Sequence, residues 1–222
     1  MTDAILDANE IRVLGSLIEK QITTPEYYPL TLNALTNACN QKNNRDPIVS
    51  FDEATVVRGL DSLRGKKLVS TVTGSGIRVP KYKHNFVEVF ELNEQEVVVL
   101  CLLMLRGPQT IGEIRSRCGS MYNFESTTDV ETTLTGLNNR EQSPLVRKLP
   151  RQTGQKESRY IHLLSGEPKV TESDIAPPLE AATIQVLAEN ERIVKLEEEV
   201  KTLHAKIQQI EQRFAEFKKQ FE

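Results

Sequence analysis

The sequence lacks tryptophan, and only 5% of its 222 residues are aromatic. It also lacks any apolar run close to the ~18 residues that mark a membrane-spanning helix. Its first ten residues, MTDAILDANE, lack the basic and apolar parts of a signal peptide. These absences argue against a membrane or secreted protein, so we predict a cytoplasmic location.

The sequence also has few cysteines and none of the common catalytic motifs. The three cysteines, Cys39, Cys101 and Cys118, are an odd number without CxxC or CxxH spacing, which argues against a disulfide framework and a zinc site. No GxGxxG, Walker A, GxSxG or HExxH pattern is present. We expect reduced cysteines in the core or in helices, no metal or cofactor, and no enzymatic activity.

Neither basic nor acidic residues are in large excess. The chain has 28 Lys and Arg against 31 Asp and Glu, for a net charge of −3. Residues 1–85 hold 11 basic against 9 acidic residues, residues 86–165 hold 9 against 10, and residues 166–222 hold 8 against 12. Any contact with DNA must therefore come from local basic patches rather than from bulk charge.

An internal repeat is the most informative feature that is present. The segments LDANEIRVLGSLIEK, from residue 6, and LNEQEVVVLCLLMLR, from residue 92, follow the same pattern. Each has an N-cap residue followed three positions later by Glu: Asp7 with Glu10, and Asn93 with Glu96. This spacing predicts a capping box at the start of two equivalent amphipathic helices.

The order of the later elements repeats too. Each copy continues with a short apolar-periodic segment and a third helix, which we expect Ser50 to cap in the first copy and Ser126 in the second. Two β-rich arms follow, around Gly74 in the first copy and Gly154 in the second. His84 and His162 fall at equivalent positions in these arms, which favours a shared packing or hydrogen-bonding role over catalysis.

Three helices followed by a hairpin are typical of a winged helix-turn-helix. The predicted fold is mainly α with small β-hairpins (α+β): two tandem winged-helix domains, residues 1–85 and 86–165, and a C-terminal coiled-coil helix.

Residues 166–180, rich in proline and acidic residues, read as a linker. Beyond it, residues 181–222 carry apolar residues at alternating spacings of three and four, the seam of a coiled coil. We predict a homodimer through this helix, with folding back onto the same chain as the alternative. The candidate dimerisation residues are Ile193, Leu196, Val200, Leu203, Ile207, Ile210, Phe214 and Phe217.

Basic residues on the third helices and hairpins are the candidates for nucleic-acid binding, because a winged helix places these elements in the groove and on phosphates. In the first copy they are Arg58, Lys66, Arg78, Lys81 and Lys83; in the second they are Arg147, Lys148, Arg151, Lys156 and Arg159. The alternative is an ordinary solvated surface, and acidic residues such as Asp52, Glu53 and Asp61 on the first of these helices would repel phosphate.

The polar stretch ACNQKNNRDP, residues 38–47, lies between the second and third helices of the first copy. A turn requires no cation, so we assign the residues of this stretch to two roles, ligand contact and turn formation. Gln41, Lys42 and Arg45 are candidate ligand contacts, with phosphate as the simplest ligand for the two cations. The Asn and Asp residues are expected to shape and cap the turn.

Two long stretches carry a family resemblance. EIRVLGSLIEKQITTPEYYPLTLNALTNACNQKNNRDP, residues 10–47, and GQKESRYIHLL, residues 154–164, resemble the YceH family of uncharacterised bacterial proteins. The resemblance covers both repeats, about three quarters of the chain. It implies a tandem winged-helix fold and does not by itself specify a function.

Two functions remain open at this point. The repeats and basic hairpins favour a dimeric, regulatory protein that binds double-stranded DNA. The near-neutral repeats and the acidic C-terminal region favour the alternative, a protein-interaction module of a bacterial assembly.

Overall fold

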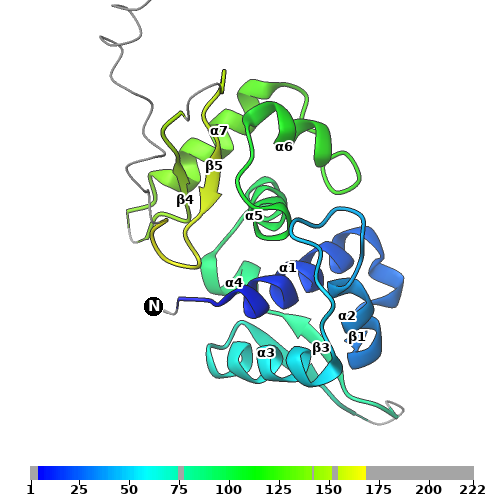
Figure 1. Ribbon diagram of the computed structural model, residues 1–222. Coiled ribbons are helices and arrows are strands. Elements are labelled where there is room, and N and C mark those ends of the chain that lie inside the picture. Colours follow the sequence, from blue (N-terminus) through cyan, green and yellow to red (C-terminus); the bar gives the residue numbers. More distant parts are fainter. Residues whose placement is uncertain (1–4, 75–77, 142, 152–154, 169–222) are drawn as a thin grey trace, which may run out of the picture. The chain divides into compact units, whose positions relative to one another are not determined.

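The computed structural model describes residues 5–168, apart from residues 75–77, 142 and 152–154. These residues belong to one compact unit. Most of the predicted linker, and the predicted coiled coil with all of its candidate dimerisation residues, lie outside the described residues. Within the described part, helices and two small antiparallel sheets confirm the α+β class (Figure 1).

The first half of the unit contains three helices and a three-stranded sheet. Its elements are α1 (Ala8–Thr23), a 3₁₀ turn (η1, Pro25–Tyr27), β1 (Leu30–Thr31), α2 (Leu32–Cys39), α3 (Glu53–Gly65), β2 (Val69–Val72) and β3 (Lys81–His84). The strands lie in the order β1-β3-β2.

The second half repeats this order after a short connecting helix. Its elements are α4 (Phe86–Phe90), α5 (Glu94–Arg106), α6 (Ile111–Arg117), α7 (Thr127–Asn138), β4 (Val146–Lys148) and β5 (Tyr160–His162). The connecting helix α4 follows the predicted boundary at residue 85 and was not expected from the sequence. It forms because Phe86 is fully buried and its ring contacts that of Phe90 in a tilted arrangement, with ring centroids 4.9 Å apart.

The helix starts follow the predicted capping in three of four cases. Capping boxes begin α1 at Asp7, α5 at Asn93 and α7 at Ser126. The prediction for Ser50 is wrong, because the side chain of Asp52 caps α3 by accepting a hydrogen bond from the backbone N–H of Thr55 at 2.8 Å. Asp is as good an N-cap as Ser, so the sequence offered two adequate candidates.

The two hairpins repeat in register as well as in order. His84 lies opposite Val69 in the first, and His162 lies opposite Val146 in the second, which confirms their equivalence. A third segment joins each hairpin at the same place: Leu30 pairs with Tyr82, and Gln109 forms a bridge with Tyr160. The internal repeat therefore extends to individual strand pairs.

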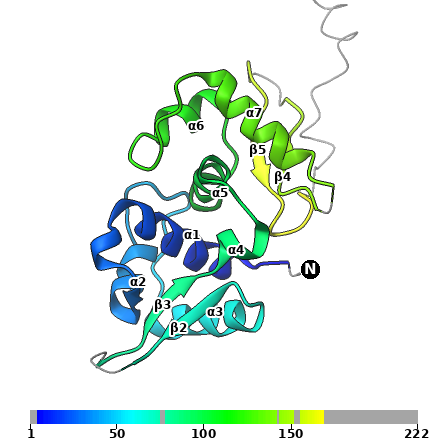
Figure 2. The same cartoon turned by 180° about the vertical axis from the view of Figure 1, so that it is seen from behind.

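The first helices of the two halves, α1 and α5, pack directly against each other (Figures 1 and 2). A Cβ atom on Gly15 would lie only 2.9 Å from Cδ2 of Leu105 and 3.3 Å from Cβ of Met104, so the two helices approach closely here. The Cys101 thiol contacts the Gly15 carbonyl oxygen at 3.5 Å. One continuous core therefore joins the halves.

Two further features bear on the sequence predictions. All three cysteines are free and buried, as predicted. Among the described residues, no helix combines the length and apolar character needed to cross a bilayer.

Candidate nucleic-acid interface

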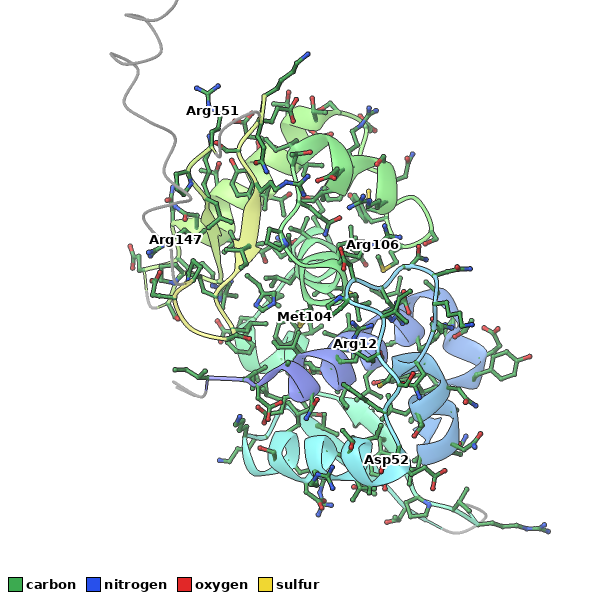
Figure 3. The ribbon with its side chains drawn as sticks, in the orientation of Figure 1. Arg12, Asp52, Met104, Arg106, Arg147 and Arg151 are labelled. Atoms are coloured by element: carbon green, nitrogen blue, oxygen red, sulfur yellow. The ribbon has the colours of Figure 1, made fainter. Side chains whose placement is uncertain are left out.

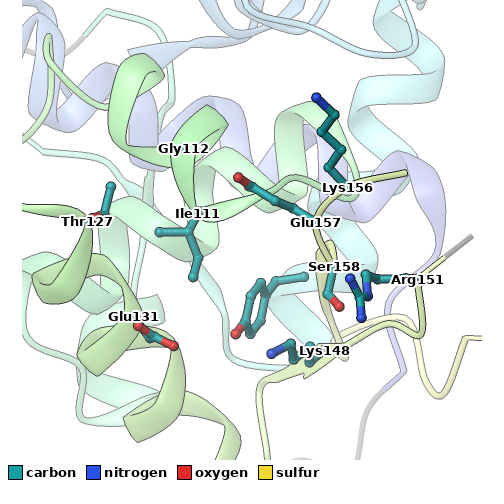
Figure 4. A pocket seen from close by; sticks show the side chains of 10 residues that line it. Ile111, Gly112, Thr127, Glu131, Lys148, Arg151, Lys156, Glu157 and Ser158 are labelled. Atoms are coloured by element: carbon teal, nitrogen blue, oxygen red, sulfur yellow. The ribbon is translucent and has the colours of Figure 1, made fainter. Parts of the chain in front are cut away.

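A groove of about 550 Å³ opens between α6, α7 and the β4-β5 hairpin (Figure 4). Its walls are formed by Ile111 and Gly112 of α6, Thr127 and Glu131 of α7, and the hairpin residues Lys148, Arg151, Lys156, Glu157, Ser158 and Tyr160. The groove therefore lies where the third helix of the repeat meets its hairpin.

Three of the predicted cations, Lys148, Arg151 and Lys156, meet at this groove. Each is exposed, and none forms an ion pair with another described residue. The ammonium group of Lys148 lies 5.9 Å from the centroid of the Tyr160 ring, within the range of a cation–π contact. With two carboxylates also present, Glu131 and Glu157, the groove carries a formal excess of one positive charge.

The other two cations of this hairpin are paired instead. Arg147 forms an exposed ion pair with Glu167 at 2.5 Å, and Figure 3 shows it well separated from Arg151. Arg159 forms an ion pair with Glu113 at 3.0 Å and donates to the carbonyl oxygen of Pro108 at 2.8 Å. Neither is among the residues that line the large groove.

In the first half, the two lysines of β3 share one face of the hairpin. Lys81 lies opposite Val72 and Lys83 opposite Ser70, whereas Tyr82 and His84 alternate with them and point toward the core side. Arg58 on α3 and Arg78 near the hairpin tip are exposed. The guanidinium of Arg58 donates to the hydroxyl of Thr55 at 2.8 Å and stays accessible at the helix surface.

Lys66 has a structural partner that the sequence did not reveal. Its ammonium donates to both carboxylate oxygens of the buried Glu10, at 2.6 and 2.7 Å, and to the carbonyl oxygen of Ile5. Burial alone would raise the pKa of Glu10, but hydrogen bonds led by that from Lys66 hold it below its usual value. Lys66 is therefore no longer a candidate for nucleic-acid binding, because a phosphate would have to compete with the buried Glu10 carboxylate for its ammonium group.

Arg45 is the clearest correction. Its side chain is fully buried and forms a two-pronged ion pair with Glu19, with N–O distances of 2.9 and 2.5 Å. It also donates to the Ala38 carbonyl at 3.0 Å and to the side-chain oxygen of Gln41 at 3.1 Å. Arg45 therefore cannot reach an external phosphate, and Gln41 is turned toward Arg45. Sequence reasoning missed this because Glu19 lies 26 residues away.

The rest of the 38–47 stretch ties α1 to α5. The backbone N–H of Asp46 donates to the Leu105 carbonyl at 2.9 Å, and the Arg12 guanidinium donates to the Pro47 carbonyl at 2.5 Å. Arg106, at the end of α5, donates to the side chain of Asn44. We call residues 40–47 the clamp loop, since they hold the first helices of both halves.

Within the clamp loop, Lys42 is the predicted cation that keeps the character of a ligand contact. It is exposed and lines a groove of about 440 Å³ together with Lys20 and Thr24 at the end of α1. Gln41 lines the same groove, while its side-chain oxygen accepts a hydrogen bond from Arg45. Asn40 fulfils its predicted turn role, because its side chain exchanges hydrogen bonds with the backbone of Phe51 at 2.7 and 2.8 Å.

The buried and half-buried histidines and cysteines have pKa shifts that favour structural roles. Burial raises the pKa of Cys39 to about 11 and also raises that of Cys101, which leaves both as weakly nucleophilic thiols at neutral pH. Burial lowers the pKa of His84 and of His162 to about 4. Among the described residues, His, Cys, Asp and Glu form no cluster of three or more that is arranged to hold a metal ion.

Comparison with known proteins places the chain among close relatives. Residues 6–155 match the family described as "Protein of unknown function, DUF480". The chain is 54% identical to a UPF0502 protein of Geotalea uraniireducens, over 98% of both chains. It is 60% identical to a UPF0502 protein of Opitutus terrae over 78% of this chain and 75% of the relative, and 53% identical to one of Geotalea daltonii over 99% and 100%. This chain belongs to the DUF480 family of bacterial proteins, also called UPF0502.

Proposed function

We propose that each half of the unit is a winged helix-turn-helix and that the protein binds double-stranded DNA as a non-enzymatic, cytoplasmic regulatory protein. The order of three helices and a hairpin, with a third segment added to each hairpin, supports the winged-helix assignment. The gathering of Lys148, Arg151 and Lys156 beside α7 carries the functional proposal, because cations that form no ion pair with any described residue suit phosphate contacts at this junction.

Dimerisation through residues 181–222 completes the proposal. A dimer doubles the number of contacts and raises the effective affinity for DNA. Replacing Leu196 and Leu203 with Glu in the full chain is expected to turn a dimer into a monomer in sedimentation analysis. A wild-type chain that sediments as a monomer at micromolar concentration would favour the folded-back alternative.

Binding to a random-sequence duplex tests the functional proposal directly. We expect measurable affinity at about 50 mM salt and a steep decrease toward about 200 mM, because each phosphate contact releases counterions. The variant Lys148→Gln, Arg151→Gln, Lys156→Gln is expected to weaken binding and to flatten the salt dependence. Absence of wild-type binding at low salt would reject DNA binding.

A third groove, distinct from those at Lys148 and Lys42, supports the protein-interaction alternative. It measures about 440 Å³ and lies between the end of α1, α4 and the start of α5; its apolar lining consists of Ile22, Val87, Leu92, Val97, Val98, Met121 and Tyr122. Capture of a stoichiometric protein partner after nuclease treatment, lost in Val87→Glu, would favour this function. A partner retained by that variant would not use this groove.

A further inference from the structure

The first and third helices of the two halves form a stack in the order α3, α1, α5, α7. Helix α3 packs on α1 at Gly59, where a Cβ atom would lie 3.2 Å from Cγ2 of Val13. Helix α7 packs on α5, and the hydroxyl of Thr133 lies 3.4 Å from the side-chain oxygen of Gln95. Because α1 and α5 fill the middle of the stack, the exposed sides of α3 and α7 point away from each other.

Figures 1 and 2 show the same separation from the front and from behind, with α3 and α7 at opposite ends of the stack. Packed helix axes are about 8–10 Å apart, so three successive steps place the axes of α3 and α7 on the order of 25 Å apart. A major groove about 12 Å wide admits one helix. A straight duplex that contacts the outer side of α7 therefore leaves the outer side of α3 uncovered.

Each outward end carries its own cations, all of them exposed except the half-buried Lys81. The α7 end has the groove with Lys148, Arg151 and Lys156. The α3 end has Arg58 on the helix, and the adjoining hairpin carries Lys81 and Lys83 on its side away from Tyr82 and His84. We define these two sets of three residues as the second-half face and the first-half face.

The junction between the halves resists a rotation that would bring both faces to one duplex. The clamp loop bonds to α5 through the Asp46 N–H and the Leu105 carbonyl, and to α1 through Arg12 and the Pro47 carbonyl. The close approach at Gly15 leaves little room for sliding, since close-packed interfaces do not deform continuously.

We propose that one chain holds two separate segments of double-stranded DNA, one on each face, and so bridges them. This inference rests on the proposed DNA-binding function. It identifies the partner as two duplex segments per chain, and it assigns the clamp loop the role of fixing the angle between them.

The number of duplexes bound per chain tests the proposal. A labelled duplex of about 12 base pairs, slightly longer than one helical turn, is titrated into the full chain at low salt and followed by sedimentation. Wild type is expected to bind two duplexes per chain. The first-half variant, Arg58→Gln, Lys81→Gln, Lys83→Gln, and the second-half variant, Lys148→Gln, Arg151→Gln, Lys156→Gln, are each expected to bind one.

Each other outcome has a distinct meaning. Wild type could instead bind one duplex per chain, with binding lost in the second-half variant and unaffected in the first-half variant. That result would overturn bridging but keep DNA binding by the second-half face. No binding by wild type overturns the proposed function itself. Because the altered side chains lie at the surface, unchanged circular dichroism and urea midpoints serve as the folding control.

Discussion

Arg45 and Glu19 form a buried, two-pronged ion pair between the clamp loop and α1, with N–O distances of 2.9 and 2.5 Å. The side chains are 0% and 8% exposed. Two charges held this far from water depend on each other, because either one left alone would be buried without compensation.

Neutralising one member of this pair should therefore strongly destabilise the fold. We expect Glu19→Gln to lower the free energy of unfolding by about 3 kcal/mol or more, because the Arg45 charge would remain buried without its counterion. Urea denaturation measures the change. The control is Asp61→Asn, which removes the exposed partner of Arg64 and should cost at most about 1 kcal/mol. Equal losses in both variants would contradict the assigned burial.

The close approach of α1 and α5 at Gly15 gives a second prediction. Gly15→Val should lower the free energy of unfolding by about 1–3 kcal/mol, because the added atoms would collide with Leu105 and Met104. Gly136→Ala in α7 is the control, since its added Cβ would meet no atom of another element within 4 Å. That variant should instead stabilise the protein by about 0.5–1 kcal/mol through reduced backbone entropy. Thermal or urea unfolding that ranks the two variants in the opposite order would refute the close approach.

The two equivalent histidines predict loss of stability in mild acid. Burial lowers the pKa of His84 and His162 from 6.5 to about 4, so the unfolded chain binds protons first. The contribution of the two histidines to the free energy of unfolding is fully present above about pH 6.5. It decreases as the pH falls toward 4, by up to about 3 kcal/mol for each histidine. Below pH 4 the histidines contribute no further change.

Urea midpoints measured between pH 4 and 7 check this dependence. Replacing His84 or His162 with Gln should flatten the curve in that range, whatever the effect on stability at pH 7. If the urea midpoint changes with pH as steeply in both variants as in wild type, other groups cause the acid sensitivity.

Neighbouring residues of β4 offer a sharp test of the second-half face. Arg147 and Lys148 carry the same charge but point to opposite sides of the hairpin, and only Lys148 lines the groove. We expect Lys148→Gln to reduce the slope of log affinity against log salt by about 1, the value for one phosphate contact, and Arg147→Gln to leave it unchanged. Fluorescence anisotropy on one duplex measures both. The reverse result would place DNA on the other side of the hairpin.

Local sequence signals predicted the start and order of most elements. The capping boxes at Asp7 and Asn93 depend only on residues three positions apart, and the periodicity of each helix depends on its own side chains. The equivalence of His84 and His162 followed from matched hairpin patterns. In contrast, α4 escaped prediction because Phe86 is ordered by burial rather than by a local cap.

Candidate contacts were predicted less well than the fold. A basic residue in a loop or at a helix end has the same sequence signature whether it faces solvent or a buried carboxylate. Arg45 and Lys66 form ion pairs with the buried Glu19 and Glu10, whereas Lys148, Arg151 and Lys156 form no ion pair with a described residue. Partners 26 and 56 residues away in the chain leave no local signal.

The sequence by itself determined the repeat, three of the four predicted caps, the α+β class and the family, because these depend on short-range periodicity and on motifs within one stretch of chain. Only the tertiary structure decided which cations are buried, how closely α1 and α5 approach at Gly15, and in which directions α3 and α7 point. Those properties depend on long-range packing, where desolvation and steric fit between distant segments select one arrangement among many with the same local pattern.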